Sequence, residues 1–274
     1  MNPNVSTKPL HRQYIETSLG KIHVAQAEGT GVPVVMWPSI FYDLSLYAGL
    51  CNCLSHPLLL IDGPGHGKSR LDRPKMTMAD CAQILAELFN VLDIAEAIVI
   101  GTSWGGIVAA EFAIRYPESI RGTVLVNTPF AMPNSPELGT RLLVAATQFI
   151  PDWRVFKQGI ARNFFAPTTQ QSYPQVIEAF LTQPATFQNP GLHAAVKAVL
   201  MERSSLVPRL PRLQTPTLVI AGAEDPLYSV AEMQAAAAKI PDHEFEVVAD
   251  SAHVSVVEQP DAIATLLHHF SSKL

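Results

Sequence analysis

A serine lies between two glycines at the spacing of a hydrolytic nucleophile. Residues 101–105 read Gly-Thr-Ser-Trp-Gly, with Ser103 at the centre. The apolar run 97–100 predicts a strand before them, and a helical pattern begins at Trp104. On so sharp a strand-to-helix turn, Cβ atoms two positions before and after the serine would meet the adjoining backbone, so glycine is needed at both. The helix N-terminus then places positive partial charge beside a developing oxyanion.

This motif predicts a nucleophilic serine, with one simpler alternative. A glycine-rich turn that opens a helix can also bind an anion without doing chemistry. A serine hydroxyl is a weak nucleophile, so catalysis needs a base to take its proton and a third group to orient that base. The rest of the chain must supply both groups.

The chain resembles the α/β-hydrolase superfamily from its first strands to its last helix. Beside the Ser103 motif, residues 62–69 read Asp-Gly-Pro-Gly-His-Gly-Lys-Ser. This segment is similar to a loop of these proteins. In the family the loop follows a strand, and the next helix and strand then lead to the nucleophile turn. For Asp62 and His66 we expect hydrogen bonding within this loop rather than catalysis.

The resemblance implies that Asp225 is the acid and His253 the general base. In the family the chain order is Ser, then Asp or Glu, then His, with the acid after a late strand and the histidine after the last one. Here Asp225 lies in the loop after the strand pattern 217–221, and His253 follows the strand pattern 245–248. Some relatives place the acid after an earlier strand, where this chain has Asn127, which cannot carry the charge.

The oxyanion hole departs from the family pattern. Relatives carry His-Gly after the strand that matches residues 34–37, but here Pro38 and Ser39 follow it. Aligning these two residues with His-Gly predicts that the backbone N–H groups of Ile40 and Trp104 form the hole. A shift of one residue would make Ser39 the donor instead of Ile40.

The elements that must position these residues alternate between strands and helices. Apolar runs predict strands at residues 22–27, 34–37, 58–61, 97–100, 123–126, 217–221 and 245–248. Amphipathic patterns predict helices at residues 78–93, 104–116 and 261–270, and Thr77 with Asp80 resembles a capping box. Such alternation predicts an α/β fold with a mostly parallel sheet flanked by helices.

One region breaks this alternation. Between residues 127 and 211 there are only helical patterns, at 137–150, 152–164, 171–181 and 192–202. We therefore expect an α/β-hydrolase core formed by residues 1–127 and 212–274, with a helical cap, residues 128–211, inserted after the sixth core strand. Its larger apolar residues either line an acyl pocket or hold the cap on the sheet: Phe156, Phe164, Phe165, Phe180, Leu181 and Phe187.

Composition excludes several other classes of protein. The 274 residues are 48% hydrophobic and 16% charged, with a net charge of −5 and no basic cluster. Neither nucleic acid nor a membrane is an expected partner, and no apolar run is long enough to span a bilayer. Three cysteines, two of them only two positions apart, fit reduced thiols in the cytoplasm. We expect no metal or cofactor, and the oligomeric state stays open.

Ser103 as nucleophile favours acyl transfer, because family members that cleave carbon–halogen bonds or epoxides use a carboxylate there. The first candidate function is cleavage of carboxylic esters of small to medium acyl chains through an acyl-enzyme, with water as second substrate. The second is a lactonase acting on acyl-homoserine or similar lactones. The third is an aminopeptidase, because a tryptophan directly after the nucleophile, here Trp104, is similar to the pattern of proline iminopeptidases. Those enzymes recognise a free amine with acidic lid residues, and Glu137, Glu178 and Glu202 are available for that role here. The fourth is a non-catalytic hydrolase-like receptor.

Overall fold

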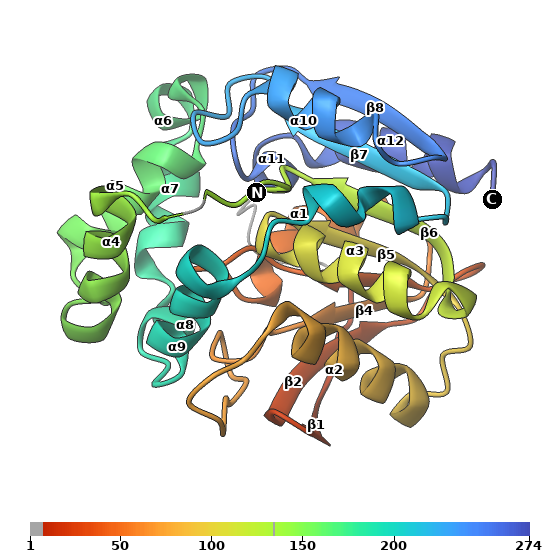
Figure 1. Cartoon of the computed structure of the whole chain (residues 1–274), viewed down its shortest axis with the longest axis horizontal. Coiled ribbons are helices and arrows are strands. Elements are labelled where there is room, and N and C mark those ends of the chain that lie inside the picture. The colour runs from red at the N-terminus through yellow and green to blue at the C-terminus, as the bar shows by residue number, and fades with distance from the viewer. Residues whose placement is uncertain (1–7, 134) are drawn as a thin grey trace.

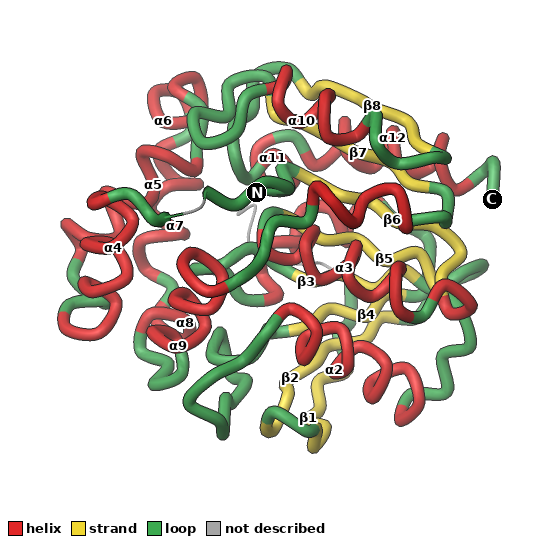
Figure 2. Tube along the Cα trace, viewed as in Figure 1, coloured by secondary structure: helices red, strands yellow, loops and turns green. Residues whose placement is uncertain are grey.

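One eight-stranded sheet organises the chain (Figures 1 and 2). The computed structural model describes residues 8–133 and 135–274. The strands are β1 (His11–Thr17), β2 (Gly20–Ala27), β3 (Val34–Trp37), β4 (Leu58–Ile61), β5 (Ala97–Thr102), β6 (Ile120–Val126), β7 (Thr217–Gly222) and β8 (His243–Val248). Their order is β1-β2-β4-β3-β5-β6-β7-β8; the pairs β1–β2 and β2–β4 are antiparallel, and the others are parallel.

Seven of these strands match the strands predicted from apolar runs. The eighth, β1, was missed because its residues are mostly polar and only Ile15 is buried. It is an edge strand that pairs with β2 alone. An edge strand with one exposed face carries little of the apolar pattern on which sequence prediction depends.

Helices cover both faces of the sheet. Outside the region between β6 and β7 they are α1 (Ala48–Cys53), α2 (Met78–Val91), α3 (Trp104–Arg115), α10 (Val230–Ala237), α11 (Ser255–Glu258) and α12 (Pro260–Ser271), with 3-10 turns η1 (Leu44–Tyr47) and η2 (Pro117–Ser119). Helices α2 and α3 pack side by side in front of the sheet in Figure 1, and α1 contacts α12. The predicted capping box of α2 is present, since Thr77 and Asp80 exchange both bonds.

A helical insertion separates β6 from β7, and its described elements lie between residues 127 and 216. It contains α4 (Leu138–Phe149), α5 (Arg154–Phe164), α6 (Pro167–Ser172), α7 (Pro174–Thr182), α8 (Pro184–Phe187), α9 (Leu192–Lys197), a π-helical turn η3 (Ala198–Glu202) and a 3-10 turn η4 (Val207–Arg212). Helices α4–α9, green to teal in Figure 1, lie beside one end of the sheet. No helix among the described residues has the length and apolar character needed to cross a membrane.

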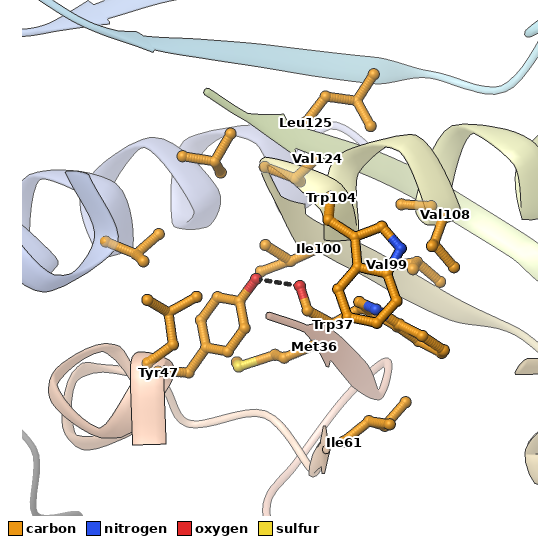
Figure 3. Close-up of a cluster of buried hydrophobic side chains, with 14 of the residues drawn as sticks. Met36, Trp37, Tyr47, Ile61, Val99, Ile100, Trp104, Val108, Val124 and Leu125 are labelled. Carbon is orange, nitrogen blue, oxygen red and sulfur yellow. Dashed lines mark hydrogen bonds between the residues drawn. The ribbon is translucent and has the colours of Figure 1, made fainter. Parts of the chain in front are cut away.

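The core lies directly beneath the serine turn. Trp37 and Trp104 are fully buried and meet edge to face, with 5.6 Å between ring centroids (Figure 3). Tyr47 donates its hydroxyl proton to the backbone carbonyl of Trp37 over 2.8 Å. These contacts fix the ends of β3 and β5 relative to the start of α3, where Ser103 lies.

Candidate active site

Ser103 has a strained backbone between β5 and α3. Its φ of 54° and ψ of −111° lie in a region that non-glycine residues rarely adopt. A Cβ on Gly101 would lie 2.0 Å from the carbonyl oxygen of Gly105, and one on Gly105 would lie 2.0 Å from that of Trp37. The two glycines therefore permit the close approach on which the turn depends, as the sequence analysis predicted.

Residues from three distant parts of the chain meet in one hydrogen-bonded row. Nε2 of His253 lies 2.8 Å from Oγ of Ser103, and Nδ1 of His253 lies 2.9 Å from Oδ2 of Asp225. All three side chains are buried, with Ser103 5% exposed. The spacing matches that of a nucleophile, a base and an orienting acid.

Asp225 is held by four donors. Besides His253, the backbone N–H groups of Leu227 and Tyr228 donate to its Oδ1, at 2.9 and 3.3 Å. The side-chain amide of Asn127 donates to its Oδ2 over 3.1 Å. These donors orient the oxygen that faces the imidazole.

Asn127 is a site residue that sequence reasoning missed. An amide cannot replace the acid, because it carries no charge. The amide of Asn127 nevertheless contacts Asp225, the acid in the loop after β7. Oδ1 of Asn127 in turn accepts a hydrogen bond of 2.7 Å from the hydroxyl of Ser255. Its place after β6, where some relatives have the acid, is the signal that could have identified it.

Aromatic rings enclose His253. The ring of Phe164, at the end of α5, lies 5.2 Å from the imidazole centroid, and the ring of Tyr228 lies 5.6 Å away. The backbone N–H of Val254 donates to the carbonyl of Phe164 over 3.2 Å. The helical insertion therefore contacts the imidazole directly and shields it from water.

Glu258 joins the loop of His253 to the helical insertion. Its carboxylate accepts from the N–H of Ala252 and, on the insertion side, from the N–H of Ala166 and the hydroxyl of Thr169, each over 2.7 Å. Burial raises the pKa of Glu258, and the three hydrogen bonds oppose that rise. Sequence reasoning missed this residue as well, because nothing local marks its partners.

The predicted oxyanion donors lie beside Ser103. Trp104 begins α3, so its N–H has no acceptor within the helix. In the described part of the chain, the N–H of Ile40 also has no acceptor, and Ile40 lines the same cavity as Ser103. Ser39 is fully buried, and its hydroxyl has no hydrogen-bond partner among the described residues.

A cavity of about 600 Å³ opens above Ser103 and His253. Its wall includes Leu143, Ile160 and Phe164 of the helical insertion. Of the other large apolar residues considered above, Phe165, Phe180 and Phe187 pack among themselves and are buried. Phe156, Phe180 and Phe187 also contact Phe41 or Tyr42 of the loop after β3, so these aromatic residues hold the insertion on the core. No group of three or more metal-binding side chains is clustered among the described residues.

Comparison with known proteins places this site in a family. The family model described as serine aminopeptidase, S33, matches residues 55–260, which is more than half of the chain and includes Ser103, Asp225 and His253. The chain belongs to this family of α/β-hydrolases. The resemblance predicted from the Ser103 motif and the predicted fold class are thereby confirmed.

Relatives with named activities cover most of this hydrolase. It is 26% identical over 271 residues to a poly(3-hydroxyalkanoate) depolymerase of Ectopseudomonas oleovorans, covering 96% of this chain and 91% of that one. It is 27% identical over 233 residues to 3-oxoadipate enol-lactonase 2 of Acinetobacter baylyi, covering 85% and 82%. A thermophilic esterase structure from Thermogutta terrifontis, reported with malate bound, is 28% identical with a TM-score of 0.86, covering 96% and 98%. The chain is therefore similar over most of its length to a depolymerase, an enol-lactonase and an esterase.

The loop after β4 supports the site without taking part in the row of three residues. Nδ1 of His23 lies 2.7 Å from Oδ2 of Asp62. The backbone N–H groups of Leu44 and Lys68 each donate a hydrogen bond to the same carboxylate over 2.8 Å. The expected role of Asp62 in hydrogen bonding within the fold is confirmed. His66 is fully buried, and its ring lies 4.9 Å from that of Trp104.

His66 makes the hydrolase sensitive to acid. Burial lowers the pKa of its imidazole from the usual 6.5 to about 4, so the folded state holds it neutral. The unfolded chain binds the proton more readily, so this contribution to stability is complete above pH 6.5 and is lost as the pH falls toward 4. We expect His66 to lower the free energy of unfolding by about 3 kcal/mol between those pH values.

Denaturant titrations at pH 7 and pH 4 measure this effect in the wild type and in His66→Phe. Phe keeps the contact with Trp104 but cannot take a proton. The loss of stability between the two pH values should therefore be smaller in the variant by the stated amount. Equal losses in the two proteins would show that His66 is protonated as easily when folded as when unfolded.

Proposed function

We propose that this hydrolase cleaves carboxylic esters of small to medium acyl chains through an acyl-enzyme, using Ser103, His253 and Asp225. The observation that carries the proposal is the continuous row from Oγ of Ser103 through His253 to Asp225 at the base of a cavity. The relatives named above support an ester or lactone as substrate.

In the first half of the proposed reaction Ser103 attacks the ester carbonyl. Nε2 of His253 accepts the hydroxyl proton, and Asp225 stabilises the imidazolium that forms. The N–H groups of Ile40 and Trp104 donate to the oxygen that gains negative charge. When the tetrahedral intermediate collapses, His253 gives its proton to the leaving alcohol, and the acyl group stays on Ser103.

In the second half water replaces the alcohol. His253 takes a proton from water, the resulting hydroxide attacks the acyl-enzyme, and the same donors stabilise the second oxyanion. His253 then returns the proton to Ser103 as the acid leaves. Phe164 and Tyr228 pack on the imidazole, so bulk water is excluded from the site of proton transfer.

The proposed role of residues 128–211 is that of a cap over the core formed by residues 1–127 and 212–274. Support comes from Phe164, which lies against His253, and from Leu143 and Ile160 in the cavity wall. A volume of about 600 Å³ suits a compact substrate. The cavity size is the reason for proposing small to medium acyl chains.

A lactonase is the second candidate, because a lactone is a cyclic ester and the relative from Acinetobacter baylyi is an enol-lactonase. The aminopeptidase candidate needs an acid in the cavity to bind a free amine. Glu137 lines the cavity, whereas Glu178 pairs with Arg154 and Glu202 pairs with Lys197.

We propose the cytoplasm as the compartment of this hydrolase, since Cys51, Cys53 and Cys81 are all free.

A substrate panel tests the proposed function. 4-Nitrophenyl esters with acyl chains of two to twelve carbons are assayed beside γ- and δ-lactones and aminoacyl 4-nitroanilides. We expect the highest kcat/KM for esters of about two to eight carbons, the small to medium acyl chains of the proposal. Faster cleavage of lactones would favour the second candidate, and turnover of anilides alone would overturn the proposal.

A further inference from the structure

Arg203 lines the cavity, as Glu137 does, and it forms no ion pair with an acid among the described residues. Arg203 lies at the end of η3, where the helical insertion turns back toward the core, and it borders the same cavity as Ser103 and His253. It is half-buried. Arg203 has no role in the proposed reaction, because no step in the cleavage of a neutral ester uses this cation.

Backbone carbonyls hold the guanidinium in place. Its Nε donates to Val199 over 3.1 Å, and its two terminal nitrogens donate to Ser204 over 3.4 Å and to Ala131 over 2.7 Å. Guanidinium carries five N–H donors in a planar fork, so these bonds leave two without a described acceptor. Neutral acceptors fix the orientation of the group but leave its charge unbalanced.

No acidic side chain among the described residues lies within ion-pair distance of Arg203. On its other side, Arg203 borders a separate hollow with two glutamates. Both have other partners, since Glu111 pairs with Arg115 and Arg209, and Glu202 pairs with Lys197. Burial lowers the pKa of Arg203, which reflects the cost of removing this unpaired charge from water.

Arg203 is also close to the proposed chemistry. Arg203 and Tyr228 line the same cavity. The ring of Tyr228 lies 5.6 Å from that of His253, and its N–H donates to Asp225. The wall of the cavity above Ser103 therefore includes this cation.

We infer that Arg203 binds a carboxylate of the substrate, so that the preferred substrates are esters or lactones that carry a free carboxylate group. Two N–H donors of a planar guanidinium match the two oxygens of a carboxylate. The anion supplies the charge that Arg203 lacks in the free protein. The inference rests on the proposed function, because it names the substrate class of the same site.

Arg203 has a structural role that the test must separate from binding. Ala131 lies where the chain enters the helical insertion and Arg203 where it returns, so their bond ties the two crossings together. Loss of that bond alone would affect all substrates to a similar extent. Loss of carboxylate binding would affect only anionic substrates.

Matched substrate pairs separate the two roles. The first pair places the charge in the acyl part, comparing mono-4-nitrophenyl glutarate with 4-nitrophenyl valerate. The second places it in the leaving group, comparing 4-acetoxybenzoate with its methyl ester. We expect the wild type to favour the anion in at least one pair by 10-fold or more in kcat/KM, mainly through a lower KM.

In Arg203→Gln this preference should fall by about 10- to 100-fold, as expected for the loss of a hydrogen-bonded ion pair. Arg203→Lys keeps the charge but not the fork, and it should retain part of the preference. The exposed Arg162 of α5 supplies the control, since Arg162→Gln removes a charge of the insertion away from the cavity.

The outcomes are distinguishable. If the wild type hydrolyses the neutral esters without favouring either anion, the inference about Arg203 is wrong and the proposed function stands. Equal losses for both members of a pair in Arg203→Gln would show a structural role only. If the wild type hydrolyses no ester of either pair, the proposed function itself fails. The wild-type comparison decides even if neither variant folds.

Discussion

Replacing Ser103 with alanine is expected to lower kcat for ester cleavage by a factor of about 10⁴ or more. Alanine has no hydroxyl to attack the carbonyl, and no other hydroxyl lies against Nε2 of His253 among the described residues. The site is built around the backbone of the turn, so removing one oxygen should leave the fold intact. Initial rates with a 4-nitrophenyl ester, beside circular dichroism spectra, measure both expectations.

A covalent probe of the nucleophile gives an independent check on Ser103. The wild type should react with a fluorophosphonate, and peptide mass spectrometry should locate the label on Ser103, whereas Ser103→Ala should stay unlabelled. This experiment also separates an enzyme from a hydrolase-like receptor. A folded wild-type protein that takes up no label would favour the receptor, and an active Ser103→Ala variant would refute the assignment.

Asp225→Asn should have the second-largest effect, lowering kcat by a factor of about 10³ to 10⁴. The carboxylate accepts a hydrogen bond from Nδ1–H of His253 and stabilises the imidazolium in the transition state. An amide removes the negative charge. If its NH₂ group faces the ring, it also favours the tautomer that cannot accept the proton of Ser103. In the wild type Asn127 donates to the same oxygen of Asp225 as His253 does. In Asp225→Asn, Asn127 therefore competes with His253 for the one oxygen that the new side chain retains.

The neighbouring acid provides a matched control for this prediction. Glu224 precedes Asp225 in the same loop, and no hydrogen bond joins its side chain to His253 in the described part of the chain. Glu224→Gln should therefore change kcat less than threefold, in the range of substitutions that leave the transition state untouched. Similar losses in the two variants would show that general negative charge in the loop, rather than a bond to His253, supports catalysis.

Most of the strands that could be predicted from the sequence are those whose burial is visible as apolar residues within the strand itself. Strands β3 to β7 are buried on both faces, so each is a short apolar run bounded by turns. The edge strand β1 was missed because its pairing with β2, and not its own side chains, makes it a strand. Ladder hydrogen bonds come from a neighbour that local sequence does not identify.

The same distinction applies to the site. The turn at Ser103 is determined by five consecutive residues, because two glycines allow contacts that no other residue permits there. The resemblance to a known family supplied Asp225 and His253 by chain order. Asn127 has only its place after β6 as a signal, and its partner lies 98 residues away. Glu258 and Arg203 carry no such signal, since their partners lie 92 and 72 residues away.

The amino-acid sequence by itself therefore determined the serine turn, the alternation of strands and helices, and the presence of a helical insertion between two strands. Each of these depends on steric or apolar preferences that act over a few residues. Only the tertiary structure decided which amide supports the acid, which carboxylate joins the insertion to the histidine loop, and which cation lines the cavity unpaired. Those properties are distances between side chains, and a distance across the fold is set by the packing of the whole chain.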